Sequence, residues 1–295
     1  MDAQYQQFLS NMAEVELVSR HVKSSMDQEQ DVMIRSHKRL IENKMDDLAS
    51  SFHNMFFQSL SDGELIFYDQ RKLGFDNRLK DLVDRRNKYY LWLLVEAFEY
   101  FEDFLELIYA HMGHKEPSTW PPKEKKGETS TSLGQKDFEW FLDKSESNKK
   151  NNVKLDCIRK RFPSLAVIEK SNHVGIDFRF AICLVEMLRH VVVHNSGRIL
   201  NVEKFVERIF EKAGMSNNGN YDPQKIKLVN TFVEPYKGQH RIIMLEIYQQ
   251  GTPFHLSRLS QIINWLLTYA DYIYRILIRP TYFAVANSND NGATP

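Results

Sequence analysis

The spacing of apolar residues along the chain predicts a protein built mainly of helices. Through residues 1–60, large apolar side chains recur every three or four positions with charged residues between them, which is typical of an amphipathic helix. Further helices are expected at 77–112, 136–144, 153–162, 175–195, 201–214 and 256–278. The 77–112 segment is apolar around most of its circumference, so we expect this helix to be buried on most sides.

One part of the chain has a different pattern. Residues 229–234 and 240–248 are rich in isoleucine, valine and aromatic residues, and a turn at 249–253 follows them. These two segments predict a small two-stranded β insert. The expected fold is therefore mainly all-α: a helical bundle with an N-terminal helical extension and this insert.

Glycine, proline and polar runs suggest how the chain is divided. We expect an N-terminal helical extension over 1–76 and a helical domain over 77–284, with insertions at 113–136 and 215–255. The tail at 285–295 is expected to be disordered. The N-terminal extension is either an amphipathic helix packed on the rest of the protein or an arm that binds a partner or a second copy.

Composition narrows the class of protein. Acidic and basic residues balance at 39 each, so any binding to nucleic acid must come from a local patch. The two cysteines form no disulfide framework and suit a reducing compartment. The most apolar stretch, 91–112, carries five acidic residues, which a membrane core would not accept. The N-terminus has no basic, apolar leader. We expect a cytoplasmic protein that binds no membrane.

The segment 186-EMLRHVVVHNSGRI-199 carries the candidate chemistry. On an ideal helix, with angles measured around the axis from Glu186, Arg189 lies at about −60°, His190 at about +40° and His194 at about +80°. These polar groups share one face, and apolar residues occupy the opposite face. Arg189 and His194 are nevertheless far apart around the helix. Joint action on one small group would require a bend near Gly197 or a second copy of the motif.

Two ordinary explanations compete with a catalytic one. A polar face is normal for an amphipathic helix, and Glu186 and Arg189 have the i, i+3 spacing of a common surface pair. Along 77–112, Glu96, Glu99, Asp103 and Glu106 form an acidic stripe, which fits a solvated or salt-bridged face. One member of this stripe could instead point into a neighbouring active site.

The run from Arg189 through His190 and three valines to His194 and Asn195 resembles the signature of the HEPN superfamily. These helical domains, named for higher eukaryotes and prokaryotes nucleotide-binding, carry an arginine, usually followed by a polar residue, four to six residues before a histidine. The resemblance covers mainly residues 80–200, together with the final helix at 256–278. Some members carry a tyrosine two residues after the histidine, linked to modification by a nucleotidyltransferase, but Ser196 occupies this position here.

The resemblance implies a metal-independent endoribonuclease of a prokaryotic toxin, abortive-infection or antiviral defence type, needing no cofactor. Active members pair the motif across a homodimer. Histidine serves as an acid or base near neutral pH, and arginine binds phosphate oxygens. We therefore expect Arg189 and His194 to be catalytic. His190, Asn195 and Glu186 are the expected supporting residues, with Glu186 holding Arg189 or a histidine in place.

A second hypothesis stays open beside the enzyme. Some HEPN domains have lost activity, so the chain could be a catalytically inactive interaction or sensing module. In either case a protein partner or antitoxin would bind through the N-terminal helices. The sequence contains no Gly-rich phosphate loop and no serine-nucleophile elbow. His111 and His114 have a metal-like spacing, but no third ligand is evident, so no metal site is predicted.

Overall fold

The computed structural model describes residues 1–45, 50–121, 127–147, 150–216, 219–248 and 255–278. These residues are mainly helical, as the apolar spacing predicted. They fall into two compact units: one comprises Leu17–Tyr90, and the other combines Met1–Glu16 with the chain from Leu91 onward. The helices α1 (Asp2–Glu42) and α2 (Phe75–Lys115) each contribute to both units, and the domain bounds expected from the sequence stay a prediction.

The Leu17–Tyr90 unit contains the later part of α1 and the first part of α2. Met26, Met33 and Leu82 form a small buried cluster between these two helical segments. Salt bridges cross between the same segments: Arg85 binds Glu29 at 2.8 Å, and Arg86 binds Asp27 at 2.8 Å. Contacts of both kinds therefore join the helical segments of this small unit.

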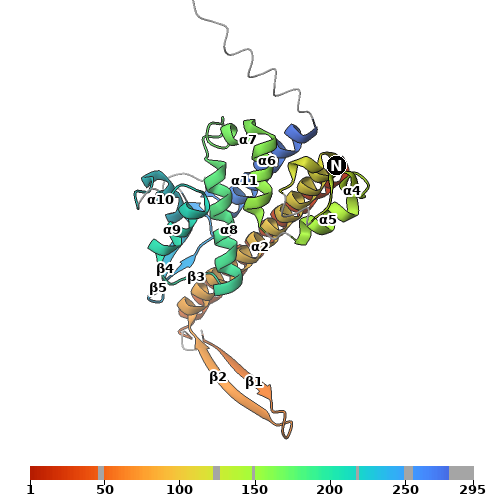
Figure 1. The fold of residues 1–295 in the computed structure, drawn as a ribbon. Helices are drawn as coiled ribbons and strands as arrows, with labels where there is room; N and C mark the ends of the chain where they lie inside the picture. The colour runs from red at the N-terminus through yellow and green to blue at the C-terminus, as the bar shows by residue number, and fades with distance from the viewer. Residues whose placement is uncertain (46–49, 122–126, 148–149, 217–218, 249–254, 279–295) are drawn as a thin grey trace, which may run out of the picture. The chain divides into compact units, whose positions relative to one another are not determined.

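The helix expected over residues 1–60 ends at Glu42, and the prediction is wrong for Ser51–Gln58, which form a strand. The chain forms two antiparallel strands, β1 (Ser51–Gln58) and β2 (Leu65–Leu73), which Figure 1 shows as an extended ribbon next to the start of α2. Their register pairs Ser51 with Leu73 and Gln58 with Leu65, with an irregularity between Met55 and Phe56. The N-terminal extension is therefore not wholly helical.

The physical reason for this error lies in the side chains of the hairpin. Phe52 and Phe56 have the i, i+4 spacing of a helix, but the segment is rich in aromatic residues, which favour strands. Asp62-Gly63 is a strong turn signal, and Gly63 adopts a φ of 75°, a conformation that glycine reaches at little cost. A turn at this place brings the two aromatic segments together as a hairpin.

The second unit holds the later part of α2 and most of the remaining elements. After α2 come the 3-10 helix η2 (Pro117–Thr119) and the helices α4 (Ser130–Leu133), α5 (Phe138–Ser147), α6 (Asn151–Arg161), α7 (Pro163–Ile168), α8 (Phe178–Asn195), α9 (Val202–Lys212), α10 (Pro223–Asn230) and α11 (Arg258–Ile278). The helices predicted at 77–112, 136–144, 153–162, 175–195, 201–214 and 256–278 all form, with ends that differ by a few residues.

Helices α8, α9 and α11, together with the later part of α2, bury the core of this unit. Helix α8 packs against α11 and α9 (Figure 1), and the apolar side of each is buried. Fully buried side chains include Phe98 and Phe101 of α2, Leu184 and Leu188 of α8, and Ile262 and Leu266 of α11. Helix α2 is buried on most sides over Leu91–Met112, as its apolar composition predicted.

The predicted β insert forms, but its strands are shorter and shifted. Strands β4 (Val233–Tyr236) and β5 (Gln239–Ile242) pair as a hairpin, and β3 (Arg198–Ile199) adds a third strand beside β5. The predicted strand at 229–234 begins only at Val233, because α10 extends to Asn230. Ile247–Tyr248 forms a separate short strand, β6, paired with β7 (His255–Leu256).

Some predictions fall outside the described residues. They are the end of the last helix near Pro280, the tail at 285–295, and the parts of the two insertions at 122–126, 217–218 and 249–254. Within the described residues, no helix is both long and apolar enough to span a membrane.

Candidate functional site

Helix α8 presents the Arg189–His194 motif, and local signals fix both of its ends. The Asp177 side chain accepts a hydrogen bond from the backbone N–H of Phe180 at 3.1 Å, which caps the first turn. After Asn195 the chain turns sharply, with Ser196 and Gly197 at φ 52° and 77°. Gly197 therefore lies just beyond the helix, where the sequence predicted a stop.

The two faces of α8 separate as the sequence predicted. The apolar positions Leu184, Leu188 and Val192 are buried. Glu186 and Arg189 are half-buried, and the remaining motif residues are exposed at the end of the helix, namely His190, His194 and Asn195. The apolar face thus fixes the helix in the core and leaves the motif accessible.

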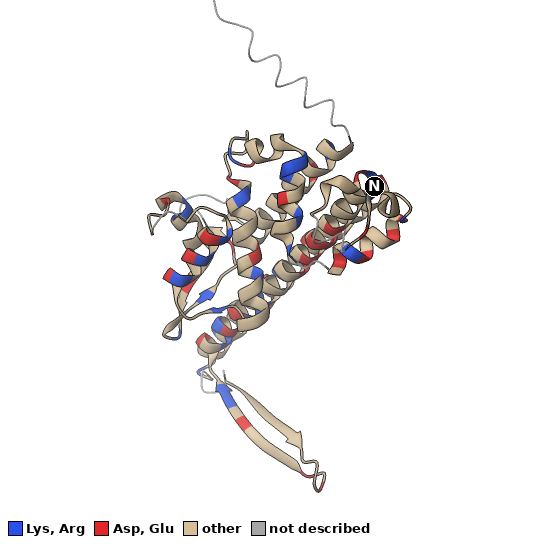
Figure 2. Cartoon of the chain, viewed as in Figure 1, with Lys and Arg blue, Asp and Glu red and all other residues tan. Residues whose placement is uncertain are grey.

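An open cavity of about 520 Å³ lies beside the first part of the motif. Its walls come from α2, α8 and α9, and its lining consists of Glu102, Glu186, Met187, Arg189, His190, Arg208, Glu211 and Lys212. Figure 2 shows acidic residues along α2 and a mixture of acidic and basic residues on α9. The structure therefore joins Glu186, Arg189 and His190 with charged groups from two other helices.

Arg189 is held by acidic residues of α2. Its Nη2 lies 3.2 Å from a carboxylate oxygen of Glu99 and 3.8 Å from one of Glu102. The Nε atom of Arg189 is buried and has no hydrogen-bond partner among the described residues. A buried donor without an acceptor is unfavourable by about 1–3 kcal/mol, so the guanidinium is incompletely paired in this position.

The acidic stripe on α2 thus includes a partner of the motif. Glu99 belongs to the stripe identified in the sequence, and Glu102 lies one turn further along. Burial raises the pKa of the Glu102 carboxyl, although the amide of Asn151 donates a hydrogen bond to it at 2.6 Å and Arg189 lies nearby. The protonated, uncharged form of Glu102 is therefore more accessible than that of an exposed glutamate.

Glu186 has a different partner from the one expected. Its carboxylate lies 2.9 Å from the Nζ atom of Lys212 on α9, so it holds this lysine rather than Arg189 or a histidine. Both side chains are about a quarter exposed or less. The pair fixes one wall of the cavity and places the lysine beside α8.

The two histidines of the motif lie next to each other, with ring centroids 4.5 Å apart. Partial burial of its ring lowers the pKa of His190, and the nearby charges of His194, Lys212 and Arg189 lower it further. His190 is therefore mainly neutral at pH 7 and presents a lone pair on one ring nitrogen. His190 lines the cavity, whereas His194 and Asn195 lie outside its lining.

The helix is unbroken from Arg189 to His194, because the turn at Ser196 follows both residues. The turn at Ser196 therefore cannot reduce the wide angle between Arg189 and His194 around the helix. The chain does turn near Gly197, as one of the two options required, but this turn leaves the angle between Arg189 and His194 unchanged. Completion by a second copy of the chain stays a prediction.

Sequence reasoning missed the contribution of α9. Arg208, Glu211 and Lys212 lie at spacings of three and four on a strongly amphipathic helix, so they share one face. This spacing was visible in the sequence, but nothing in it indicated that the charged face of α9 lies beside α8. The position of Glu102 likewise depends on tertiary packing.

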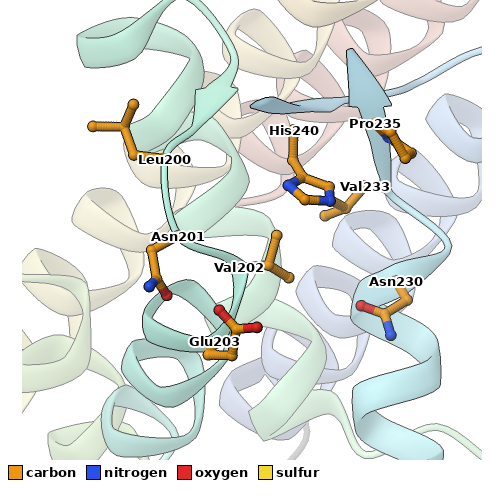
Figure 3. A pocket seen from close by; sticks show the side chains of 8 residues that line it. All are labelled: Leu200, Asn201, Val202, Glu203, Asn230, Val233, Pro235 and His240. Carbon is orange, nitrogen blue, oxygen red and sulfur yellow. The ribbon is translucent and has the colours of Figure 1, made fainter. Parts of the chain in front are cut away.

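A second cavity, of about 420 Å³, has a different chemistry. Figure 3 shows His240 of β5 together with Val202 and Glu203 of α9 in its walls. Its lining includes one carboxylate and no lysine or arginine, so it offers a phosphate no permanent positive charge. The cavity beside Arg189 is therefore the better candidate site.

Comparisons with protein-family models, curated proteins and solved structures found no match for this chain. The described residues contain no group of three or more His, Cys, Asp or Glu side chains arranged to hold a metal ion. The support for the candidate site therefore comes from the chemistry and geometry of its own residues.

Proposed function

We propose that this chain is a HEPN-like, metal-independent endoribonuclease of a prokaryotic toxin or defence type, which cleaves RNA by attack of a 2′-hydroxyl. The observation that carries the proposal is the state of Arg189. It lies on the wall of an open cavity, and its buried Nε–H has no hydrogen-bond partner among the described residues. Two further cations, Arg208 and Lys212, line the same cavity.

In the proposed reaction, Arg189 binds the scissile phosphate. Its planar guanidinium matches two phosphate oxygens, and its Nε has no hydrogen-bond partner among the described residues. The phosphate replaces Glu99, whose side chain is 53% exposed, as the partner of Nη2. As the 2′-oxygen attacks phosphorus, Arg189 stabilises the additional negative charge on the equatorial oxygens.

His194 transfers the protons. A base takes the proton from the 2′-hydroxyl, and an acid gives a proton to the departing 5′-oxygen, so the products are a 2′,3′-cyclic phosphate and a 5′-hydroxyl. His190 lies 4.5 Å from His194, centroid to centroid, and its lowered pKa keeps it mainly neutral. We assign His190 and Asn195 to orienting the phosphate or His194.

A homodimer completes the site in this proposal. Arg189 faces the cavity, whereas His194 lies outside its lining on an unbroken helix. A second copy related by two-fold symmetry supplies another arginine and another histidine. The acid and the base of one cleavage step then come from two chains.

The reaction is tested by incubating the purified chain with labelled single-stranded RNA in EDTA. We expect cleavage with 2′,3′-cyclic phosphate ends, and no cleavage where the nucleotide before the scissile bond is 2′-deoxy, since the attacking hydroxyl is then missing. Arg189→Ala and His194→Ala are expected to lose cleavage. Val193→Ala, a change at an exposed position of the same helix, is the matched control.

The proposal is wrong if both alanine variants cut as well as the wild type, or if the wild type cuts no RNA under any activating condition. Because regulated toxins are silent until triggered, the assay is repeated with RNA and lysate from phage-infected cells. A product carrying a 3′-phosphate from the start of the reaction would also contradict the 2′-hydroxyl mechanism.

One observation favours the alternative, a catalytically inactive interaction or sensing module. The cavity lining holds the acids Glu102, Glu186 and Glu211 against three cations, so it carries little net positive charge. A site of this kind attracts RNA weakly on its own. The alternative predicts that the chain cleaves no RNA, and that it binds its partner equally well as the wild type, as Arg189→Ala and as His194→Ala.

A further inference from the structure

The β1–β2 hairpin exposes an unusual amount of apolar surface. Eight large apolar side chains on its strands and turn are between 43% and 106% exposed: Phe52, Phe56, Phe57, Leu60, Leu65, Ile66, Phe67 and Tyr68. With aromatic side chains of 150–250 Å² each, the exposed apolar area is roughly 800 Å² over both faces. Each face therefore carries about 400 Å², which is in the range of the largest apolar patch of a typical monomer, and such patches are often functional, so this surface is a candidate interface.

The backbone of the hairpin is also incomplete. The sheet has two strands, so each strand keeps one edge without a neighbouring strand among the described residues. A two-stranded hairpin is only marginally stable in water, and an exposed edge favours pairing with another chain. Both features indicate a ribbon that is stabilised by a partner.

The charges of the hairpin show which partner fits. Asp62 and Glu64 lie at the turn, whereas Arg71 and Lys72 lie at the opposite end of β2, and the strands between them are largely uncharged (Figure 2). The side chain of Asp69 forms a salt bridge with Arg71 at 3.0 Å. Lys72, at the same end, forms no salt bridge with an acid of the described ribbon. The ribbon is therefore acidic at the turn and basic at the base.

We propose that the hairpin is a dimerisation arm whose partner is the hairpin of a second copy of this chain. An antiparallel, two-fold arrangement places the acidic turn of each ribbon against the basic base of the other. A parallel arrangement would place like charges together. Two ribbons that wrap around each other cover both apolar faces, and roughly 800 Å² per partner is the area that a standard interface buries.

The apolar contacts in this dimer centre on one pair of facing residues. Phe56 lies opposite Phe67 in the register of the hairpin, so their side chains share a face, and both are more than half exposed. Aromatic side chains at the centre of an interface contribute most of its affinity, whereas exposed charge pairs mainly fix orientation. Phe56 and Phe67 therefore provide affinity, and Glu64 and Lys72 provide direction.

This inference stands on the hairpin and does not depend on the ribonuclease proposal. Sedimentation equilibrium of the full chain at low micromolar concentration tests it, because no RNA is involved. We expect the wild type to be a dimer and the double variant Phe56→Ser/Phe67→Ser to raise the dimer Kd by at least about tenfold. The matched control, Ile34→Ser/Val83→Ser, changes exposed apolar residues on the helices of the same unit and is expected to leave the Kd unchanged.

Charge exchange tests the antiparallel arrangement. Glu64→Lys alone and Lys72→Glu alone are each expected to weaken the homodimer, since like charges then meet twice. Mixing the two single variants restores both attractive pairs, so we expect a heterodimer that is several-fold tighter than either homodimer. The proposal is overturned if the wild type is monomeric at every concentration, or if the serine variants and their controls dimerise equally. Mixed variants with no preference for each other would overturn the antiparallel arrangement.

Discussion

Helix α8 and the β1–β2 hairpin place apolar residues at regular positions, but only the helix buries them. Leu184 and Leu188 of α8 are fully buried, while the charged motif remains accessible on the other side. The hairpin has the reverse arrangement, with Phe56 and Phe67 exposed and few charges between its ends. The comparison shows two surfaces of different kinds: one holds charged groups beside a buried core, and the other exposes apolar side chains.

The largest effect expected from this comparison concerns the two faces of α8. Leu188→Ala removes a fully buried side chain and is expected to lower the free energy of unfolding by about 2–5 kcal/mol. Val193→Ala shortens a similar side chain that is 41% exposed, and its effect is expected to stay within about 0.5 kcal/mol. Urea unfolding followed by circular dichroism measures both. Equal losses would contradict the separation of the faces.

A smaller effect is expected from releasing Arg189. Glu99→Gln removes the carboxylate that lies 3.2 Å from Nη2, so the arginine becomes more available to a phosphate. An exposed ion pair contributes about 0.2–1 kcal/mol, so RNA binding is expected to tighten by up to about fivefold. Fluorescence anisotropy with labelled RNA measures the Kd, in a His194→Ala background so that the RNA stays intact.

The matched control for this prediction is Glu96→Gln. Glu96 lies one turn earlier on α2 and accepts a hydrogen bond from Tyr100 at 3.0 Å. Its replacement removes the same charge from the same helix but leaves the contacts of Arg189 unchanged. Equal tightening in both variants would mean that general charge, and not the pairing of Arg189, limits RNA binding.

The smallest effect concerns protonation of His190. Its pKa is lowered first by burial and then by His194, so it is expected to titrate below 6.5. Below pH 6.5 this histidine binds protons more readily in the unfolded chain than in the folded one. It therefore lowers the free energy of unfolding as the pH falls through 6.5. His194→Ala is expected to raise the pKa of His190, measured by NMR titration, because one of the charges that lower it is removed. A pKa of His190 at or above 6.5 in the wild type would refute this account.

The sequence predicted α8 correctly but assigned the first strand of the hairpin to a helix, and the difference has a physical reason. On α8 the apolar spacing and the buried face coincide, so periodicity alone placed Leu188 inside and Arg189 on the accessible side. In the hairpin the apolar residues face no core of their own chain. Periodicity then carries little information about secondary structure, and Phe52 and Phe56 were assigned to a helix.

The candidate site was predictable only in part. Arg189, His190 and Glu186 meet at one cavity, as their shared face predicted. The partners of Arg189, Glu99 and Glu102, lie 90 and 87 positions earlier in the chain, and the partner of Glu186, Lys212, lies 26 positions later. Such contacts follow from the packing of α2 and α9 against α8, and no local pattern in the sequence encodes them.

The rate of RNA cleavage by Arg189→Ala relative to the wild type, measured in EDTA, tests the central claim most directly. The account predicts a rate at least about 100-fold lower, because removal of one group that stabilises transition-state charge costs roughly 10²–10³ in rate. The variant should keep the unfolding midpoint of the wild type, since Arg189 lies on the accessible face of α8. A folded Arg189→Ala chain that cuts RNA at the wild-type rate would contradict the account.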